Sequence, residues 1–230
     1  LFEMGGGLSK SICPLRQTTQ CCQHFIKGKN MKLRILLSLL FLLLATGCAS
    51  TKMTVKSDQQ MTTPTAGTSQ VIFMRSSFLG SAIQASVFDV TSGDPEFIGI
   101  LSNATKLAYD VKPGYHVFMV VSEAADFMEA NLAVGKTYFA MVTPRMGAWK
   151  ARFSMYPVRN GGQGEFQYSS DEFQKWLRSS QFVGNTSESE AWFKENLSSI
   201  KSKQSDYWQV WQEKSQADIM ERTLNPEDGI

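Results

Sequence analysis

The sequence predicts a mainly β protein, an antiparallel β-sandwich followed by a C-terminal helical region. Three observations lead to this fold class. Short runs rich in β-branched and aromatic residues alternate with turn residues from residue 71 to 158, at the spacing expected of a sandwich. The connections between these runs are too short to hold crossover helices, so the strands are expected to pair largely antiparallel. From about residue 170 onward, the spacing of the apolar residues becomes helical.

An N-terminal segment precedes this fold and has the order of a secretory signal. Residues 31–34 contain two basic side chains, residues 35–44 form an apolar run interrupted only by Ser38, and small residues lead from there to Cys48. This order is typical of a cleaved signal peptide. A helix that spans a membrane needs about 20 apolar residues, so the run is too short for a permanent span. Residues 31–47 are therefore predicted to be a signal peptide.

The residues around Cys48 indicate the kind of signal. Ala45, Thr46 and Gly47 stand directly before it, and the group resembles a bacterial lipobox, in which the cysteine thiol receives diacylglycerol and the peptide is cut just before the cysteine. The resemblance implies that Cys48 is lipidated and is the first mature residue. In the alternative interpretation, Cys48 is a bystander in a cleaved secretory signal or in a buried hairpin. Ala49 resembles an outer-membrane sorting signal, which implies a lipid anchor in the bacterial outer membrane, facing the periplasm.

If Met31 is the translation start, residues 1–30 are an upstream extension of the reading frame without structure. They show no sustained helix or strand period. The competing interpretation is a metal site, whose candidate ligands are Cys13, Cys21, Cys22 and His24. Their spacing matches none of the common zinc patterns, and adjacent cysteines seldom both bind one ion well. We therefore expect no metal there.

The charge of the remaining chain excludes one class of partner. The sequence has 23 basic and 21 acidic residues, but residues 1–47 hold six of the basic and one of the acidic ones. Residues 48–230 therefore carry a net charge of about −3 and contain no basic run. A weakly acidic chain without a basic patch has no electrostatic footprint for nucleic acid. Apart from the lipid, nothing in it draws the chain to an anionic membrane surface.

The mature chain contains little that indicates a reaction. His116 is its single histidine, no cysteine follows Cys48, and neither a nucleophile elbow nor a phosphate-binding loop is present. A zinc site would need two or more carboxylates, and no spacing typical of such a site occurs. His116 falls inside a predicted central strand, where a histidine bonded to the backbone is expected. The sequence therefore predicts a non-enzymatic protein without cofactor or metal.

Residues 48–70 are predicted to be the lipidated cysteine and a flexible tether. The segment after Cys48 is rich in Thr, Ser and Gln and contains no aromatic residue, a composition typical of a linker. A flexible chain of this length has an end-to-end distance of about 25 Å. The folded part is then expected about one domain diameter from the bilayer.

The domain from residue 71 to 160 is expected to be the β-sandwich. Its strands are separated by Pro, Gly, Asn and Asp residues with known turn chemistry. The run from Tyr115 to Val121 is apolar on both faces, which indicates a central strand. Its most buried positions are expected to be Val117, Phe118, Met119 and Val120. The expected strands are Val71–Arg75, Ala82–Val90, Glu96–Leu101, Lys106–Val111, Tyr115–Ser122, Phe127–Val134, Lys136–Thr143 and Trp149–Val158.

Three stretches of this domain also carry a family resemblance. They are residues 71–82, residues 111–116 with the Pro113-Gly114 turn, and residues 132–138 with Gly-Lys-Thr-Tyr. Their order resembles the small β-sandwich domain of bacterial outer-membrane lipoproteins of undefined function, which is similar in outline to transthyretin-like and carboxypeptidase-regulatory-like sandwiches. The resemblance covers about 90 residues and implies a sandwich fold. It implies no catalytic residue, because that family has no established active site.

Residues 161–230 are expected to form a helical appendage after a glycine-rich hinge at residues 160–164. Ser170 is followed by two acidic residues, the pattern of a helix N-cap and first turn. A second, long helix is expected from Ser187 to about Arg222, with Pro226 and Gly229 to stop it. Its buried stripe is expected to be Phe193, Leu197, Ile200, Tyr207 and Trp211.

Four of the five tryptophans lie in the helical region. Either they pack the helices onto the sandwich, or they form an exposed aromatic stripe. Trp208 and Trp211 are three residues apart, on neighbouring helix faces, and are the expected contact with a partner. The sequence thus predicts a lipid-anchored envelope protein with a protein-interaction or structural role. The alternative is a peptidoglycan- or glycan-binding module that uses surface aromatics, which a concave aromatic row beside amides or carboxylates would favour over a flat apolar helix face.

Overall fold

The computed structural model describes residues 52–76, 83–145, 152–162 and 164–230. The predicted upstream extension, the signal peptide, the lipobox residues Ala45, Thr46 and Gly47, and Cys48 itself lie outside these ranges, so the statements about them stay predictions. Within the described part, the chain is mainly β and has a C-terminal helical segment, as predicted.

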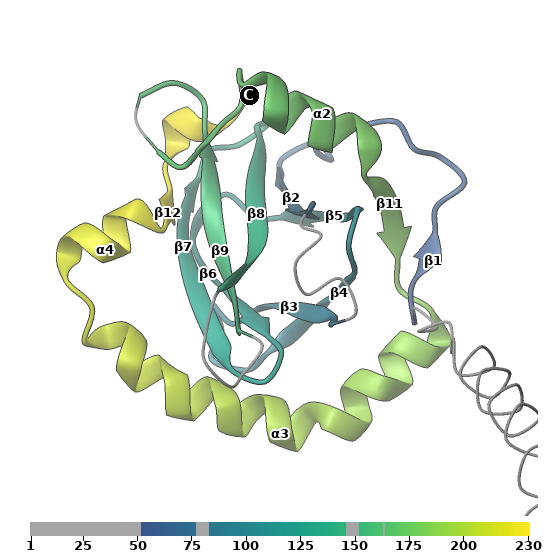
Figure 1. The fold of residues 1–230 in the computed structure, drawn as a ribbon, viewed down its shortest axis with the longest axis vertical. Helices are drawn as coiled ribbons and strands as arrows, with labels where there is room; N and C mark the ends of the chain where they lie inside the picture. The colour runs from purple at the N-terminus through teal and green to yellow at the C-terminus, as the bar shows by residue number, and fades with distance from the viewer. Residues whose placement is uncertain (1–51, 77–82, 146–151, 163) are drawn as a thin grey trace, which may run out of the picture. The chain divides into compact units, whose positions relative to one another are not determined.

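The strands form two sheets (Figure 1). All eight predicted strands are present, close to their expected ends. The five-stranded sheet has the order β12 (Thr223–Leu224), β7 (Ala125–Leu132), β6 (Gly114–Val121), β3 (Ala85–Asp89) and β4 (Glu96–Leu101). The seven-stranded sheet has the order β1 (Thr54–Val55), β11 (Gln181–Gly184), β5 (Thr105–Val111), β2 (Ser69–Arg75), β8 (Thr137–Arg145), β9 (Arg152–Arg159) and β10 (Phe166–Gln167).

The pairing of the strands is mixed, which corrects the expectation of largely antiparallel pairing in one respect. Neighbours in sequence, such as β6 with β7 and β8 with β9, pair antiparallel as expected. The central pair β2 and β8 is parallel, with Ile72 opposite Phe139. The chain between them holds β3, β4, β5, β6 and β7. The crossover that a helix usually provides is therefore made by strands, four of the other sheet and β5 of the same sheet.

The main core lies between the two sheets. Its buried side chains come from β2, β5, β8 and β9 on one side and from β3, β4, β6 and β7 on the other. The ring of Phe73 on β2 meets the ring of Phe118 on β6 edge to face, with 5.1 Å between the centroids. Both side chains are fully buried, so this contact joins the two sheets at their centres.

Both sheets also bury their outer faces. A second cluster lies between the five-stranded sheet and α3 (Ser187–Gln212), and a third lies between the seven-stranded sheet and α2 (Asp171–Ser179). Figure 1 shows α2 and α3 on opposite sides of the sheets. On β6, Phe118 and Val120 point between the sheets, whereas Val117 and Met119 point toward α3. All four are buried, which confirms the prediction for this strand.

The helices begin where the sequence predicts. The hydroxyl of Ser170 accepts from the backbone N–H of Phe173 and caps α2. Thr186 and Ser189 form a capping box at the start of α3. The predicted C-terminal end is wrong, because α3 ends at Gln212 and a separate helix, α4 (Gln216–Glu221), follows. Ser215 accepts from the Asp218 backbone N–H and starts this new helix, which turns the chain back toward the sheets.

The predicted stripe of α3 is only partly the buried one. Ile200 and Trp211 are buried, and Phe193 and Tyr207 pack beside them. Leu197 is half-buried and lies outside this cluster, whereas Trp192 and Trp208 belong to it. Phe193 and Trp211 are 18 residues apart, which is five turns of 3.6 residues, so the predicted stripe stays on one helix face. Trp192 and Trp208 lie beside this face and widen the buried surface. Lys203 is half-buried and bonds to a backbone carbonyl.

The C-terminal residues are not a separate appendage, which corrects the division at residue 160. β11 adds to the seven-stranded sheet beside β5, and β12 adds to the five-stranded sheet beside β7. Arg159 Nη1 donates to the Asp228 carboxylate at 2.6 Å, and both side chains are buried. The described residues therefore belong to a single unit, because the last 70 residues complete both sheets.

The segment predicted as a free tether is attached to the fold from its first described residue. β1 pairs antiparallel with β11, and the side chain of Met53 is buried in the main core. The side-chain amide of Gln59 bonds to both the N–H and the carbonyl of Phe182. The prediction of a flexible tether is wrong for these residues. Met53 anchors this mostly polar segment, and nothing in the local sequence indicates that its side chain is buried.

We predict that Phe118→Ala lowers the free energy of unfolding by about 3 to 5 kcal/mol, because it empties the centre of the main core. Denaturant unfolding followed by tryptophan fluorescence measures this loss. Tyr115→Ala on the same strand is the matched control, since Tyr115 is 52% exposed and should cost less than about 1 kcal/mol. Equal losses in the two variants would contradict the assignment of the core.

Candidate functional site

The single histidine of the described chain sits in a buried polar cluster at the ends of β3 and β6. His116 Nδ1 lies 3.2 Å from Asp89 Oδ2, and His116 Nε2 lies 2.8 Å from the carbonyl oxygen of Lys112. The Thr91 hydroxyl and backbone N–H both donate to Asp89 Oδ1. Each ring nitrogen therefore faces an acceptor. This arrangement favours the doubly protonated imidazolium, which donates on both sides.

The pKa values of the pair follow from these bonds. Burial raises the pKa of Asp89, but the hydrogen bonds from His116 and Thr91 and the charge of His116 outweigh it, so the pKa lies below 3.8. Burial lowers the pKa of His116, but the bonds to Asp89 and to the Lys112 carbonyl outweigh it, so the pKa lies above 6.5. Each shift favours the charged form of its group. A histidine with both nitrogens occupied has no free nitrogen to act as a base, so the cluster is structural.

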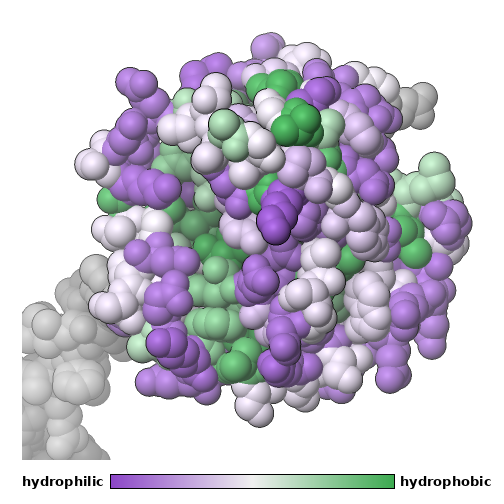
Figure 2. Space-filling model, turned by 180° about the vertical axis from the view of Figure 1, so that it is seen from behind, coloured by the Kyte–Doolittle hydropathy of each residue, from purple (hydrophilic) through white to green (hydrophobic). Residues whose placement is uncertain are grey.

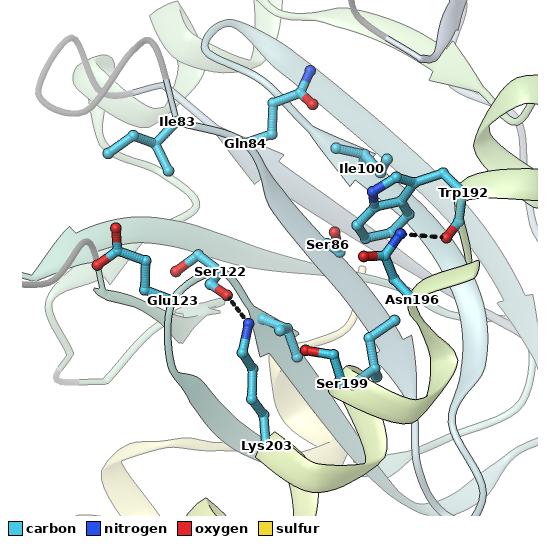
Figure 3. A pocket seen from close by; sticks show the side chains of 12 residues that line it. Ile83, Gln84, Ser86, Ile100, Ser122, Glu123, Trp192, Asn196, Ser199 and Lys203 are labelled. Atoms are coloured by element: carbon cyan, nitrogen blue, oxygen red, sulfur yellow. Dashed lines mark hydrogen bonds between the residues drawn. The ribbon is translucent and has the colours of Figure 1, made fainter. Parts of the chain in front are cut away.

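A first surface recess, which we call the Trp192 pocket, lies between α3 and the edge of the five-stranded sheet (Figure 3). Its volume is about 220 Å³. The polar groups that line it mostly bond to each other or to neighbours. Lys203 Nζ donates to the Ser122 carbonyl at 2.6 Å, and Asn196 Nδ2 donates to the Trp192 carbonyl at 2.8 Å. The pocket therefore offers few polar groups that still need a partner.

The Trp192 pocket also contains the arrangement closest to a catalytic pair. Ser199 and Lys203 are four residues apart on α3, and both line the pocket. A lysine can activate a serine hydroxyl when it accepts the hydroxyl proton. Here Lys203 Nζ instead donates to the carbonyl oxygen of Ser122. The geometry therefore supports a lysine that holds the β6–β7 turn against α3.

A second recess, which we call the Trp208 hollow, lies on the other side of α3. Its volume is about 420 Å³, and its lining consists of Val90, Thr91, Gly93, Tyr115, Val117, Gln204 and Trp208. Tyr115 is 52% exposed, and Trp208 is half-buried. The ring of Trp208 meets the ring of Phe127 edge to face, with 5.0 Å between the centroids. Because Trp208 is only half-buried, part of its indole remains at the surface.

Polar groups surround the aromatic side chains of the Trp208 hollow. Gln204 Nε2 donates to the Gly93 carbonyl at 2.8 Å, which fixes the side-chain amide at the rim. Burial raises the pKa of Tyr115, and the charge of Glu129 and a hydrogen bond to it raise it further. The same carboxylate accepts from Trp211 Nε1 at 3.3 Å. The hollow thus combines apolar ring surface with an amide, a hydroxyl and a nearby carboxylate.

The structure separates the two tryptophans that the sequence names as a partner contact. Trp211 is 2% exposed and packs on Phe127 and Arg222, as the intramolecular packing alternative describes. Trp208 reaches the surface in the hollow. A partner contact at this position stays a prediction and rests on Trp208. No local sequence pattern marks Tyr115 and Gln204 as surface neighbours of Trp208, because nothing in either segment shows that α3 crosses the start of β6.

The face of the molecule opposite the view of Figure 1 also combines apolar and polar side chains in a recess (Figure 2). Hydrophobic side chains gather there in a recess that hydrophilic side chains surround, rather than on a flat apolar face (Figure 2). Among the described residues, no helix is long and apolar enough to cross a membrane. Within the same ranges, no group of three or more His, Cys, Asp or Glu side chains is placed to hold a metal ion.

Comparison with protein-family models, with curated proteins and with solved structures gave no match for this chain. The fold and the site define a two-sheet, mainly β domain with a C-terminal helical segment and surface recesses beside α3. The resemblance to bacterial lipoprotein sandwiches stays a prediction from the sequence.

We predict that the Asp89–His116 pair makes stability depend on pH in two steps. The Asp89 contribution is present above its unfolded pKa of 3.8 and is lost as the pH falls through its lower folded pKa. The His116 contribution is present below its unfolded pKa of 6.5 and is lost as the pH rises through its higher folded pKa. Melting temperatures of the wild type and of His116→Gln should differ most between these two values.

In that range, the substitution should cost about 2 kcal/mol, the usual value for a hydrogen bond to a charged group. The difference should shrink at higher and at lower pH. The control is Lys201→Gln, which removes a solvent-exposed ion pair with Asp94 and should leave the pH profile unchanged. A constant difference between wild type and His116→Gln at every pH would show that the pair is not ionised.

Proposed function

We propose that this chain is a lipid-anchored protein of the bacterial envelope with a non-enzymatic role in contacting another protein. The anchor is supported by the sequence, where a basic start, an apolar run and small residues precede Cys48. The contact role is supported by the described domain. We also propose that the protein is anchored in the outer membrane and faces the periplasm, which rests on Ala49 directly after Cys48.

The Trp208 hollow is the observation that carries the contact role. It brings Trp208 and Tyr115 together at the surface, although they come from α3 and β6. Protein interfaces are enriched in tryptophan and tyrosine, and their strongest contacts fill pockets of this kind. Val90 and Val117 form an apolar part of its wall. An inserted side chain of a partner would bury ring surface that is now in water.

The buried charges support a non-enzymatic role, since they are engaged within the scaffold. Asp89 is paired with His116, and Asp126 with Arg222. Asp228 is paired with Arg159. These pairs connect strands to one another or connect the C-terminal segment to the sheets, so each has a structural reason to be present. The recesses beside α3 are then available for recognition.

A glycan is the second candidate ligand, and one observation favours it. The Trp208 hollow is concave and places the amide of Gln204 and the hydroxyl of Thr91 beside the two aromatic side chains. The apolar face of a sugar ring can stack on an aromatic ring, and sugar hydroxyls bond to amides and hydroxyls. A few polar groups in an apolar recess are the usual means of orienting a small ligand.

We predict that Cys48 carries the lipid and is the first mature residue. Growth with a clickable fatty acid should label the wild-type protein, and Cys48→Ser should abolish the label and leave the protein unprocessed or soluble. Stable anchoring needs two or more acyl chains, so the wild type should remain in the membrane fraction after a high-salt wash. Absence of label on the wild type would contradict the anchor, and recovery in the inner-membrane fraction would contradict the proposed sorting.

We predict that Tyr115→Ala lowers crosslinking to a partner protein in intact cells about tenfold, the effect of losing about 1.4 kcal/mol. Tyr115 is exposed, so the variant should keep its melting temperature. Gln204→Ala should have a smaller effect on a protein contact, whereas both variants should reduce retention on purified peptidoglycan if the ligand is a glycan. Val210→Ala is the control, because Val210 is exposed on α3 and does not line the hollow. Wild-type behaviour of all variants in both assays would refute the role of the hollow.

A further inference from the structure

The chain is fixed to the domain from Lys52 onward. The Thr186 hydroxyl donates to the Lys52 carbonyl at 2.6 Å, and Lys52 Nζ pairs with Glu188 at 3.0 Å. The next side chain, Met53, is 4% exposed and lies in the main core. Thr54 and Val55 then pair with β11. A hydrogen bond, an ion pair, a buried side chain and a strand ladder therefore hold this segment in place.

The distance along the chain from Cys48 to this attachment is short. Lys52 is the fourth residue after Cys48, and a fully extended chain spans at most 3.3 to 3.6 Å per residue. If Cys48 carries the proposed lipid, Lys52 lies within about 14 Å of the lipid-bearing residue. This reach is about half the 25 Å expected for a flexible tether through residue 70. The domain would then lie against the membrane.

We propose that the segment Lys52–Met61, which we call the β1 edge, is a surface that contacts the lipid bilayer; this inference rests on the proposed lipidation of Cys48. The edge exposes apolar side chains, since Val55 is 49% and Met61 is 40% exposed. Lys52 and Lys56 have long apolar stems and terminal charges, which suit the boundary between acyl chains and headgroups. Apolar and cationic side chains together are typical of a surface that lies on a membrane.

The charge of the β1 edge identifies what drives the contact. Lys52 is paired with Glu188, and Asp58 lies two residues from Lys56. Positive and negative charges therefore balance, and an anionic surface gains little from attracting this edge. The short connection to the lipid and the exposed apolar side chains are the remaining sources of contact. The contact should thus be insensitive to salt and should disappear when the connection is lengthened.

The β1 edge and the Trp208 hollow lie at opposite ends of α3. Thr186, which bonds to Lys52, caps the start of the helix, and Trp208 lies 22 residues further on. At a rise of 1.5 Å per residue, this is about 33 Å along the helix axis. In Figure 1, one end of α3 adjoins β1 and β11, and the other leads to α4. A bilayer contact at the β1 edge would therefore leave the hollow open to a partner.

The test uses the processed, lipidated protein in vesicles of phosphatidylethanolamine and phosphatidylglycerol. No cysteine follows Cys48, so Val55→Cys and Met61→Cys each introduce a single free thiol for a fluorescent label. Lipids with a nitroxide on the acyl chain should quench the labels at positions 55 and 61 several-fold more than a label in Val210→Cys, the matched exposed control at the far end of α3. Addition of 0.5 M salt, a concentration that strongly screens charges, should leave the difference unchanged.

Two further variants separate the causes. A flexible insertion of 20 Gly and Ser residues after Ser50 should reduce quenching at position 55 to the level of position 210, since it adds about 25 Å of reach. Quenching that survives the insertion would overturn the role of the short connection. Equal quenching at positions 55 and 210 in protein that carries the fatty-acid label would overturn the inference and leave the proposed anchor intact. Protein without that label would instead refute the anchor itself, and the inference with it.

Discussion

Burial of both faces of both sheets is the constraint on which the rest of the structure depends. Phe118 and Met119 are neighbours on β6 and point to opposite faces, yet both are fully buried. An apolar sheet face needs a cover, and a domain is built from layers that supply it. The second sheet covers the inner face and α3 covers the outer one. The C-terminal residues are thus required by the strands and could not have remained an appendage.

Buried ion pairs then fix how the C-terminal segment is held. Apolar burial is non-directional, whereas a pair such as Arg222 and Asp126, at 2.7 Å, needs one placement of the end of α4 relative to β7. The Arg222 guanidinium also donates to the Met155 carbonyl, and Ser154 donates to the same Asp126 carboxylate. Removal of one partner would leave a buried charge uncompensated, at a cost of about 3 to 5 kcal/mol. Charged residues of the interior that could suggest catalysis are therefore explained by assembly.

Assembly also determines what remains at the surface. Recesses remain beside α3, and one of them exposes Trp208 and Tyr115. The N-cap of α3, Thr186, bonds to Lys52, which is close in sequence to Cys48, the proposed site of lipidation. The same helix therefore connects the proposed anchor to the proposed contact surface. Its rigidity gives the two a fixed separation, which a flexible tether would not provide.

The sequence by itself determined the local elements of this protein. Apolar runs bounded by turn residues, such as Glu96–Leu101, and caps such as Ser170 depend on neighbouring residues and are therefore visible in a linear pattern. The remaining features depend on contacts between distant residues. Two-residue strands such as β12 have too few residues to show a period, and Met53 became an anchor only because the main core had a place for it. The Trp208 hollow exists because α3 crosses the start of β6, a juxtaposition that only the tertiary structure decided, since nothing in either segment encodes the position of the other.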